Sequence, residues 1–249
     1  MAPSDSPKNR DAFSELMSQK PEAMKQVAGP DRRDGLLAYV ESPASFPGSR
    51  VLYHTDDFVA IHDLYPKSTV HLLLLPRDPS KFLLHPFDAL ADPVFLSAVR
   101  AEATKLKGLA ASELARLLSA HSQSDRERRR AMEVEPPLEE LPPGRDWAAE
   151  IRVGIHAHPS MNHLHIHLLS RDMHSDCLKH RKHYHSFNTP FFIPLDDFPL
   201  REDDVRRHPG HEGYLQRDFV CWRCGKGFGN RFKALKEHLE VEFREWRKE

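Results

Sequence analysis

The most regular pattern of apolar and polar positions in the chain lies at residues 161–169, where histidines alternate with apolar residues. Alternation with a period of two predicts a β-strand with one half-buried face. The imidazoles of His163, His165 and His167 would then project from the same face, about 6–7 Å apart along the strand. A row of imidazoles is a poor hydrophobic face, but each ring can act as nucleophile, acid, base or hydrogen-bond donor near neutral pH. The pattern therefore predicts a strand that carries chemistry.

Apolar periodicity predicts further elements on both sides of this strand. Residues 58–76 carry β-forming residues on either side of a turn at Pro66, which predicts two strands joined by a turn. A helix is expected near 88–118. Three stretches lack such periodicity and are expected to be poorly ordered or to act as linkers, namely the start of the chain, a charged and proline-rich insert at about 119–145, and 199–213.

Two chemical interpretations of the histidine run compete with a purely structural one. His163, His165 and His167 could bind a metal, because neutral imidazole is a common ligand. Alternatively, one imidazole attacks phosphorus while its neighbours donate hydrogen bonds to phosphate oxygens. The structural alternative is a histidine-rich edge strand without chemistry. The upstream segment 154–160 favours the nucleophile, because it supplies a fourth imidazole, His156, and a hydroxyl before the strand.

The C-terminal region has the ligand spacing of a ββα zinc finger. Cys221 and Cys224 are separated by two residues, and His238 follows after 13 more. The usual second histidine is missing, and Glu242 stands four residues after His238 on the same helix face. Carboxylate oxygen is an acceptable zinc ligand, so the spacing predicts a Cys-Cys-His-Glu site for one structural zinc ion. The alternatives are a finger that no longer binds metal and a three-ligand site completed by water.

The finger carries an excess of positive charge. Residues 214–249 contain nine Lys or Arg and six Asp or Glu, an excess of three. Such residues suggest contacts with nucleic-acid phosphates, and a single finger reads only about three base pairs, so backbone anchoring is favoured over sequence recognition. A protein-binding finger is the alternative. The candidate DNA-binding residues of the finger are Arg223, Lys226, Arg231 and Lys233, with Lys236 in the same cluster.

The motif His-Φ-His-Φ-His-Φ-Φ, with Φ apolar, is matched at every position of 163–169, and the chain resembles the histidine-triad (HIT) superfamily of nucleotide hydrolases and transferases. The resemblance implies that His165 attacks the α-phosphate and forms a nucleotidyl-histidine. It implies that His163 orients His165 and fixes its tautomer, and that His167 and His156 contact the phosphate oxygens and the leaving group. The implied fold is α+β, a HIT fold with an antiparallel sheet and flanking helices, followed here by the ββα zinc finger. No metal is expected in the chemical step.

In the HIT fold the hairpin at 58–76 carries the nucleoside. The resemblance places Asp63 at the ribose hydroxyls, Ile61 and Leu64 around the base, and Lys67 beside the phosphate. For Asp63 alone, an acid that stabilises the turn is the competing interpretation.

Between the triad and the finger, residues 172–189 interleave cations, hydroxyls and aromatics, as in a surface that follows a phosphate backbone and stacks on bases. A triad, this segment and a zinc finger together resemble the aprataxin family of DNA-adenylate hydrolases, over about 31–105 and 146–247. The fungal members, which lack a forkhead-associated domain and use a glutamate in the finger, are the most similar. The resemblance implies hydrolysis of AMP from 5′-adenylated DNA ends or nicks in single-strand break repair, with little dependence on sequence and AMP as product.

The same resemblance assigns residues to the pocket and to the DNA end. It places an N-terminal helix at 31–40 as a wedge against the terminal base pair, with Leu36 on its apolar face and Arg32 where an aromatic residue is expected. The other residues it assigns to the pocket or the DNA end are Ser160, Met161, Lys179, Lys182, His183, Ser186 and Asn188. Two other functions remain open: a HIT hydrolase of free nucleotides, such as a dinucleoside polyphosphate or nucleoside phosphoramidate, and a nucleic-acid-binding protein without catalysis.

Composition sets the remaining expectations. The chain has 249 residues and a net charge of −1, so attraction to DNA has to be local. Cys177 is left over from the zinc ligands, which argues against a disulfide framework. No long apolar segment or signal peptide is apparent, so a soluble, nuclear protein without a membrane partner is expected. The expected domains are a partly disordered tail (1–30), the HIT domain (31–198), a linker (199–213) and the finger (214–249).

Overall fold

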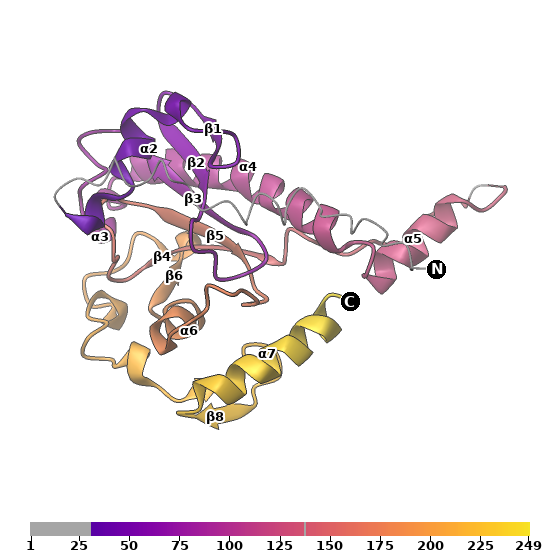
Figure 1. Ribbon diagram of the computed structural model, residues 1–249. Helices are drawn as coiled ribbons and strands as arrows, with labels where there is room; N and C mark the ends of the chain where they lie inside the picture. The colour runs from indigo at the N-terminus through magenta and orange to yellow at the C-terminus, as the bar shows by residue number, and fades with distance from the viewer. Residues whose placement is uncertain (1–30, 137) are drawn as a thin grey trace, which may run out of the picture.

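The computed structural model describes residues 31–136 and 138–249, so the predicted tail at 1–30 lies outside the described residues. Within the described residues a six-stranded antiparallel sheet occupies the centre of the molecule, with strand order β1-β2-β3-β5-β4-β6 (Figure 1). The strands are β1 (Val51–His54), β2 (Phe58–His62), β3 (His71–Pro76), β4 (Ile151–His156), β5 (Ile166–Ser170), β6 (Phe192–Pro194), β7 (Phe219–Val220) and β8 (Gly227–Gly229). The predicted α+β class and the antiparallel sheet are confirmed.

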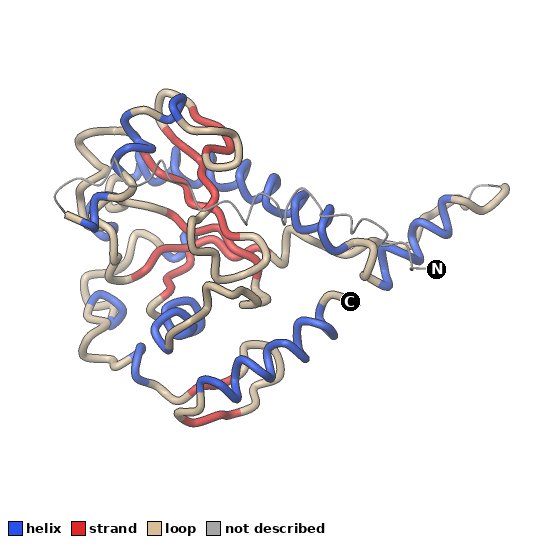
Figure 2. Tube along the Cα trace, in the orientation of Figure 1, coloured by secondary structure: helices blue, strands red, loops and turns tan. Residues whose placement is uncertain are grey.

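Helices lie on both faces of this sheet and at the C-terminal end of the chain (Figure 2). The α-helices are α2 (Leu37–Glu41), α3 (Pro86–Ala89), α4 (Pro93–Leu118), α5 (Gln123–Met132), α6 (Arg181–Asn188) and α7 (Phe232–Trp246). Short 3-10 helices are η2 (Arg32–Asp34), η3 (Pro43–Ser45), η4 (Leu195–Asp197), η5 (Val205–Arg207) and η6 (Tyr214–Gln216). No helix of the described residues is both long enough and apolar enough to cross a membrane.

Strand β3 shows how the sequence builds two cores. All of its positions are buried, because alternate side chains enter different clusters on the two faces of the sheet. Leu72 and Leu74 pack with the apolar face of α4, whereas Leu73 and Leu75 pack with α2. Helix α4 begins where Asp92 accepts hydrogen bonds from the main-chain N–H groups of the first turn, the usual geometry of an N-cap. The helix expected near 88–118 is thus two helices, α3 and α4.

The histidine-rich strand is shorter than the alternation predicted. Of the three alternating histidines only His167 lies in β5, whereas His163 lies in a bend and His165 in irregular chain before the strand. The main-chain N–H of Leu164 donates to the carbonyl of Phe82 in a loop (2.7 Å) instead of to β3. The prediction that one strand carries all three imidazoles was therefore wrong, because the chain before β5 forms its main-chain hydrogen bond with a loop residue and not with a neighbouring strand.

The insert at 119–145 contains a regular helix where the sequence pattern predicted poor order. Helix α5 projects from the body of the molecule (Figure 1). It begins at Ser122, whose side chain accepts from the N–H of Asp125. The carboxylate of Asp125 accepts in turn from the Trp147 indole N–H (2.9 Å) and from the Arg145 main-chain N–H (3.0 Å). These bonds anchor the start of α5, and the expectation of disorder is corrected for Gln123–Met132.

The C-terminal unit has the predicted ββα order, β7, β8 and α7, and its helix packs on the domain that contains the six-stranded sheet. Trp246 near the end of α7 is buried, and its indole N–H donates to Glu150 at the start of β4 (3.0 Å). The guanidinium of Arg145 lies between the rings of Trp147 and Trp246, 4.6 Å from each centroid. The segment expected as a linker, 199–213, includes η5 and joins the two units.

Candidate active site and metal centre

Four imidazoles converge where β4 and β5 lie side by side, those of His71, His156, His165 and His167. Gly154 pairs with His167 across the two strands, which places His156, two residues further along β4, on the same face. The His156 and His167 ring centroids are 4.4 Å apart, and those of His165 and His167 are 4.9 Å apart. A glycine is required at 154, because a Cβ there would lie 2.5 Å from the carbonyl oxygen of Ile193 in β6. The cluster is therefore held by close packing of β4, β5 and β6.

The tautomer of His165 is determined by the main chain. Its Nδ1 lies 2.7 Å from the carbonyl oxygen of His163, which can only accept, so Nδ1 carries the proton. In the neutral ring the lone pair is then on Nε2. This is the arrangement that an imidazole nucleophile needs, and His165 is 4 % exposed.

His163 contacts His165 through its main chain, whereas its ring points elsewhere. Its carbonyl holds His165, while its imidazole stacks on Phe82, with 5.3 Å between centroids. The contact is compatible with the predicted orienting role, which stays a prediction, and it would be the backbone of His163 that performs it.

Sequence reasoning missed His71, the first residue of β3. Its Nδ1 accepts from the main-chain N–H of Lys67 (3.1 Å), so in the neutral ring Nε2 carries the proton. This Nε2 lies 3.0 Å from Nδ1 of His167 and 3.4 Å from a carboxylate oxygen of Asp63. His71 therefore donates to Nδ1 of His167, which leaves the proton of His167 on its Nε2. The available signal was a single polar residue at the start of a strand that is otherwise apolar.

Asp63, His71 and His167 also lie close enough together to be considered as a metal site. The hydrogen bonds argue against this use. The Nδ1 lone pair of His71 is engaged by Lys67, and its Nε2 is a donor, so this ring offers a metal no lone pair while these bonds are kept. The group is better described as a chain of hydrogen bonds that orients His167.

Burial lowers the pKa of every histidine in the cluster. For His165 the loss of hydration is the main cause, and for His156 and His167 the repulsion between neighbouring imidazoles adds to it and takes the pKa well below its ordinary value. Burial also lowers the pKa of His71 to about 4 and, with the largest contribution again from desolvation, lowers that of His163. The cluster is therefore neutral near pH 7.

Three ring nitrogens in the cluster are buried but have no hydrogen-bond partner among the described residues. They are Nε2 of His156, Nδ1 of His163 and Nε2 of His167. Buried polar atoms are usually satisfied, and an unsatisfied one costs about 1–3 kcal/mol. Phe187 of α6 packs against the rings of His156 and His167, with centroid distances of 4.6 and 5.1 Å. The arrangement suits a ligand with hydrogen-bonding oxygens at this point.

The hairpin residues lie beside the cluster. Asp63 accepts from the main-chain N–H of Tyr65 (2.7 Å), which is the turn-stabilising role, and its second oxygen faces His71. Ile61 is buried in the core under α2, and Leu64 is half-buried. The amine of Lys67 donates to the carbonyl of Tyr65. Asp63 thus has one role in the turn and keeps one oxygen on the side of the imidazoles.

A large open cavity of about 3300 Å³ brings together most of the predicted residues. Asn188 lies outside it, and its side chain donates to the carbonyl of Tyr184. The finger contributes Lys236 of α7 to the cavity. The predicted residues that line it are Arg32, Leu36, Ile61, Asp63, Leu64, Lys67, His156, Ser160, Met161, His165, His167, Lys179, Lys182, His183 and Ser186.

The other basic residues of the finger lie elsewhere. The Arg223 guanidinium donates to Glu242 (2.6 Å), and the Arg231 side chain donates to the carbonyl of Phe228 (3.3 Å). Lys226 lies over the ring of Phe228, and Lys233 lies 3.9 Å from Glu237. None of the four lines the active-site cavity.

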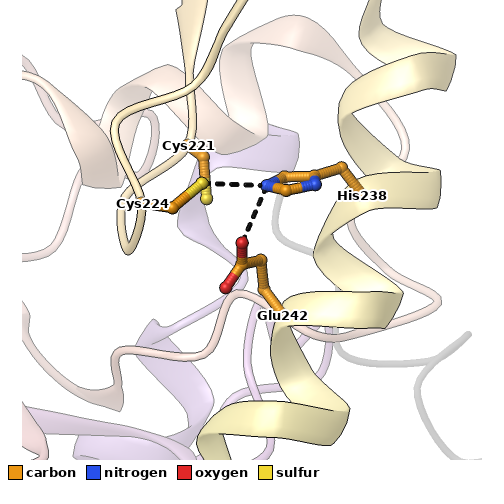
Figure 3. Close-up of side chains that lie close together, drawn as sticks. All are labelled: Cys221, Cys224, His238 and Glu242. Atoms are coloured by element: carbon orange, nitrogen blue, oxygen red, sulfur yellow. Dashed lines mark hydrogen bonds and ion pairs between the residues drawn. The ribbon is translucent and has the colours of Figure 1, made fainter.

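The predicted zinc ligands converge between the β7–β8 hairpin and α7 (Figure 3). Ligand atoms of Cys221, Cys224, His238 and Glu242 all lie within 4.8 Å of one another. Nε2 of His238 is 3.1 Å from Sγ of Cys224 and 3.0 Å from a carboxylate oxygen of Glu242. Two thiolates, an imidazole and a carboxylate are a donor set that zinc accepts in tetrahedral geometry. Arg223 holds the other oxygen of Glu242, as an outer partner that orients a ligand.

Comparisons with known proteins match both parts of the chain. The HIT domain family matches residues 47–174, and the C2HE / C2H2 / C2HC zinc-binding finger family matches 188–245. The chain is similar to the aprataxin-like protein of Schizosaccharomyces pombe, with 34% identity over 96% of this chain and 95% of that protein. The aprataxin-like protein of Saccharomyces cerevisiae is 35% identical over 85% of this chain and 95% of its own length. A crystal structure of the aprataxin ortholog Hnt3 in complex with DNA superimposes with a TM-score of 0.68 at 33% identity, over 87% of this chain and 96% of that one.

Proposed function

The chain belongs to the aprataxin-like proteins of the HIT family, and on that premise we propose that it hydrolyses AMP from 5′-adenylated DNA ends and nicks. The observation that carries the proposal is the pair of opposite tautomers in the cluster. His165 offers a lone pair on Nε2, while His167 offers an N–H at the same ring position. A nucleophile and a donor for the developing phosphate charge thus lie side by side.

The proposed reaction has two displacements. Nε2 of His165 attacks the phosphorus of the adenylyl group, and the bond to the 5′-phosphate oxygen of the DNA breaks. The DNA leaves with its 5′-phosphate, and the adenylyl group stays on the imidazole. Water then attacks the same phosphorus, the P–N bond breaks, and AMP leaves. The unpartnered N–H of His167 would stabilise charge on a non-bridging oxygen in both steps, and His156 would face the leaving group.

The nucleoside and the DNA occupy the surrounding cavity in this proposal. Asp63 would accept from the ribose hydroxyls with the oxygen that faces His71, and Lys67 would lie near the phosphates. Lys182 of α6 and Lys236 of α7 would contact the DNA backbone, with little dependence on sequence. The relative Hnt3 has been solved with DNA, which supports a DNA substrate here. A role in DNA repair, and with it a nuclear location, follows from that substrate.

Zinc has a structural role in this proposal. Cys221, Cys224, His238 and Glu242 would hold one ion that stabilises the finger. No catalytic step is assigned to it, because the four ligands lie in the finger and the imidazoles lie at the sheet.

The test compares a 5′-adenylated nicked duplex with a free adenylated dinucleotide as substrates. We expect AMP release from the duplex, loss of that activity in His165→Ala, and full activity in His121→Ala, an exposed histidine outside the site. Rapid denaturation at alkaline pH during turnover, where a P–N bond to imidazole is stable, should trap AMP covalently bound to the wild-type protein. Preference for the dinucleotide would indicate a hydrolase of free nucleotides, and binding without turnover would indicate a non-catalytic nucleic-acid-binding protein. Full activity of His165→Ala would refute the mechanism.

A further inference from the structure

A second cleft, of about 650 Å³, lies between the far ends of β4 and β5 and the finger. It is separate from the histidine cavity and is lined by residues of both units, among them Arg152, Arg171 and Trp222. Arg152 and Leu169 are paired across β4 and β5, and Arg171 is two residues beyond Leu169. The two arginines are therefore diagonal neighbours on one face of the sheet, about 7–8 Å apart.

Arg152 is a half-buried cation without an anionic partner. Among the described residues its guanidinium makes no hydrogen bond or ion pair, and it lies 4.7 Å from the centroid of the Phe192 ring. Burial, together with the positive charge of Arg171, lowers its pKa to about 10. A charge that is taken out of water normally has a partner, because its desolvation is costly. The environment of Arg152 therefore calls for an anion.

Other groups around the cleft supply further donors. The Arg171 guanidinium has a long contact to Glu150 (3.6 Å) and lies 5.9 Å from the centroid of the Trp222 ring, and its side chain is about half exposed. The indole N–H of Trp222 is buried and has no acceptor among the described residues. The acid in the lining, Glu249, is already paired with Arg223 (3.2 Å). Two guanidinium groups and an N–H donor are thus available, and no carboxylate in the lining is free to neutralise them.

We propose that this cleft binds a phosphate group between Arg152 and Arg171, with the indole N–H of Trp222 as a third donor. Guanidinium groups match the oxygens of phosphate in geometry and charge. The phosphate could belong to the backbone of bound DNA or be a free ion. On β4, Arg152 precedes His156 by four residues, which is about 13 Å along the strand. At a rise of 3.4 Å per nucleotide this corresponds to about four base pairs from the histidine cluster. The assignment of the phosphate to DNA rests on the proposed function, because it assumes that DNA is bound at that cluster.

The test uses the full-length protein and Arg152→Met, which keeps the apolar stem over Phe192 and removes the charge. Thermal unfolding is followed while inorganic phosphate replaces chloride at constant ionic strength. We expect phosphate to raise the Tm of the wild type more than that of the variant. Without phosphate the variant should be at least as stable as the wild type, because an unpaired buried charge has been removed. Arg201→Met, at an exposed arginine paired with Asp203, is the matched control and should behave as wild type.

A second arm measures the affinity for unmodified nicked duplex as a function of salt. Loss of one phosphate contact lowers the slope of log K against log salt by about 0.9. A lower slope in Arg152→Met supports a DNA phosphate in the cleft, and an unchanged slope with a reduced phosphate effect on Tm supports a free ion. Arg171→Met repeats both arms in case the first variant does not fold. Wild-type behaviour of the variants in both arms would overturn the proposal, whether or not the enzyme hydrolyses adenylated DNA.

Discussion

Substitution of His71 by leucine tests the hydrogen-bond chain that orients the histidine cluster. The imidazole is buried, and its pKa falls from an ordinary value of 6.5 to about 4 in the folded protein. Between these values the unfolded chain binds the proton and the folded protein does not, so stability falls as the pH falls from about 6.5 towards 4. The difference of about 2.5 in pKa, at about 1.4 kcal/mol for each unit, corresponds to about 3–4 kcal/mol. Above pH 6.5 this contribution is fully present.

His71→Leu removes that titration and also the donor to Nδ1 of His167. The His167 ring can then adopt either tautomer, so the fraction with an N–H towards the substrate falls and kcat should decrease, by at most the roughly 10²–10³ expected for complete loss of one donor. Urea unfolding at pH 7.5 and at pH 4.5 measures the linkage, and single-turnover AMP release measures the chemistry. The loss of stability between the two pH values should be smaller in the variant by roughly 2–3 kcal/mol, whereas His121→Leu should match the wild type. A variant with the wild-type pH dependence and the wild-type kcat would show that His71 neither titrates as argued nor orients His167.

Three further substitutions test the packing and the metal site. Trp246→Ala should lower the free energy of unfolding in urea by about 3–5 kcal/mol, because a buried indole that joins the finger to the HIT domain is lost. Gly154→Ala should cost about 1–3 kcal/mol in the same assay, since the new Cβ would lie 2.5 Å from the carbonyl oxygen of Ile193 and 2.7 Å from the ring of Phe192. Glu242→Ala should release zinc to a competing chelator faster than wild type or Glu245→Ala, and equal zinc retention would exclude Glu242 as a ligand.

The elements that could be predicted from the sequence are those determined by residues close together in the chain. The zinc ligands are an example, because the spacing of Cys221 and Cys224 on a hairpin and of His238 and Glu242 on a helix fixes their geometry locally. The sheet could be predicted for a similar reason, since a short run of apolar residues such as the one that forms β3 is typical of a buried strand. The roles of His165 and of its neighbours came from a motif that the comparisons place in the HIT family.

The features that could not be predicted depend on contacts between distant segments. His71 is 96 residues from His167, and nothing near either residue marks them as partners. The sequence predicts poor order where helix α5 forms, because the bond from Trp147 to Asp125 that anchors the helix joins residues 22 positions apart. Strand β5 was predicted too long because its start also depends on a contact with a distant segment. Its first half pairs with a loop, and the alternation of residue types does not reveal which partner a strand will find.

The cluster needs neutral imidazoles, and the fold ensures this by crowding them. Each proton added to one ring raises the cost of the next, so burial and mutual repulsion keep the pKa values low together. Neutrality alone would still leave each ring with two tautomers. A main-chain carbonyl selects one tautomer for His165, and the main-chain N–H of Lys67, acting through His71, selects the opposite one for His167. Because both selecting groups belong to the backbone, the two rings keep complementary roles as long as the loops at 63–69 and 161–165 hold their conformation. This is why we expect substitutions that move these loops to lower kcat even where they leave every imidazole in place.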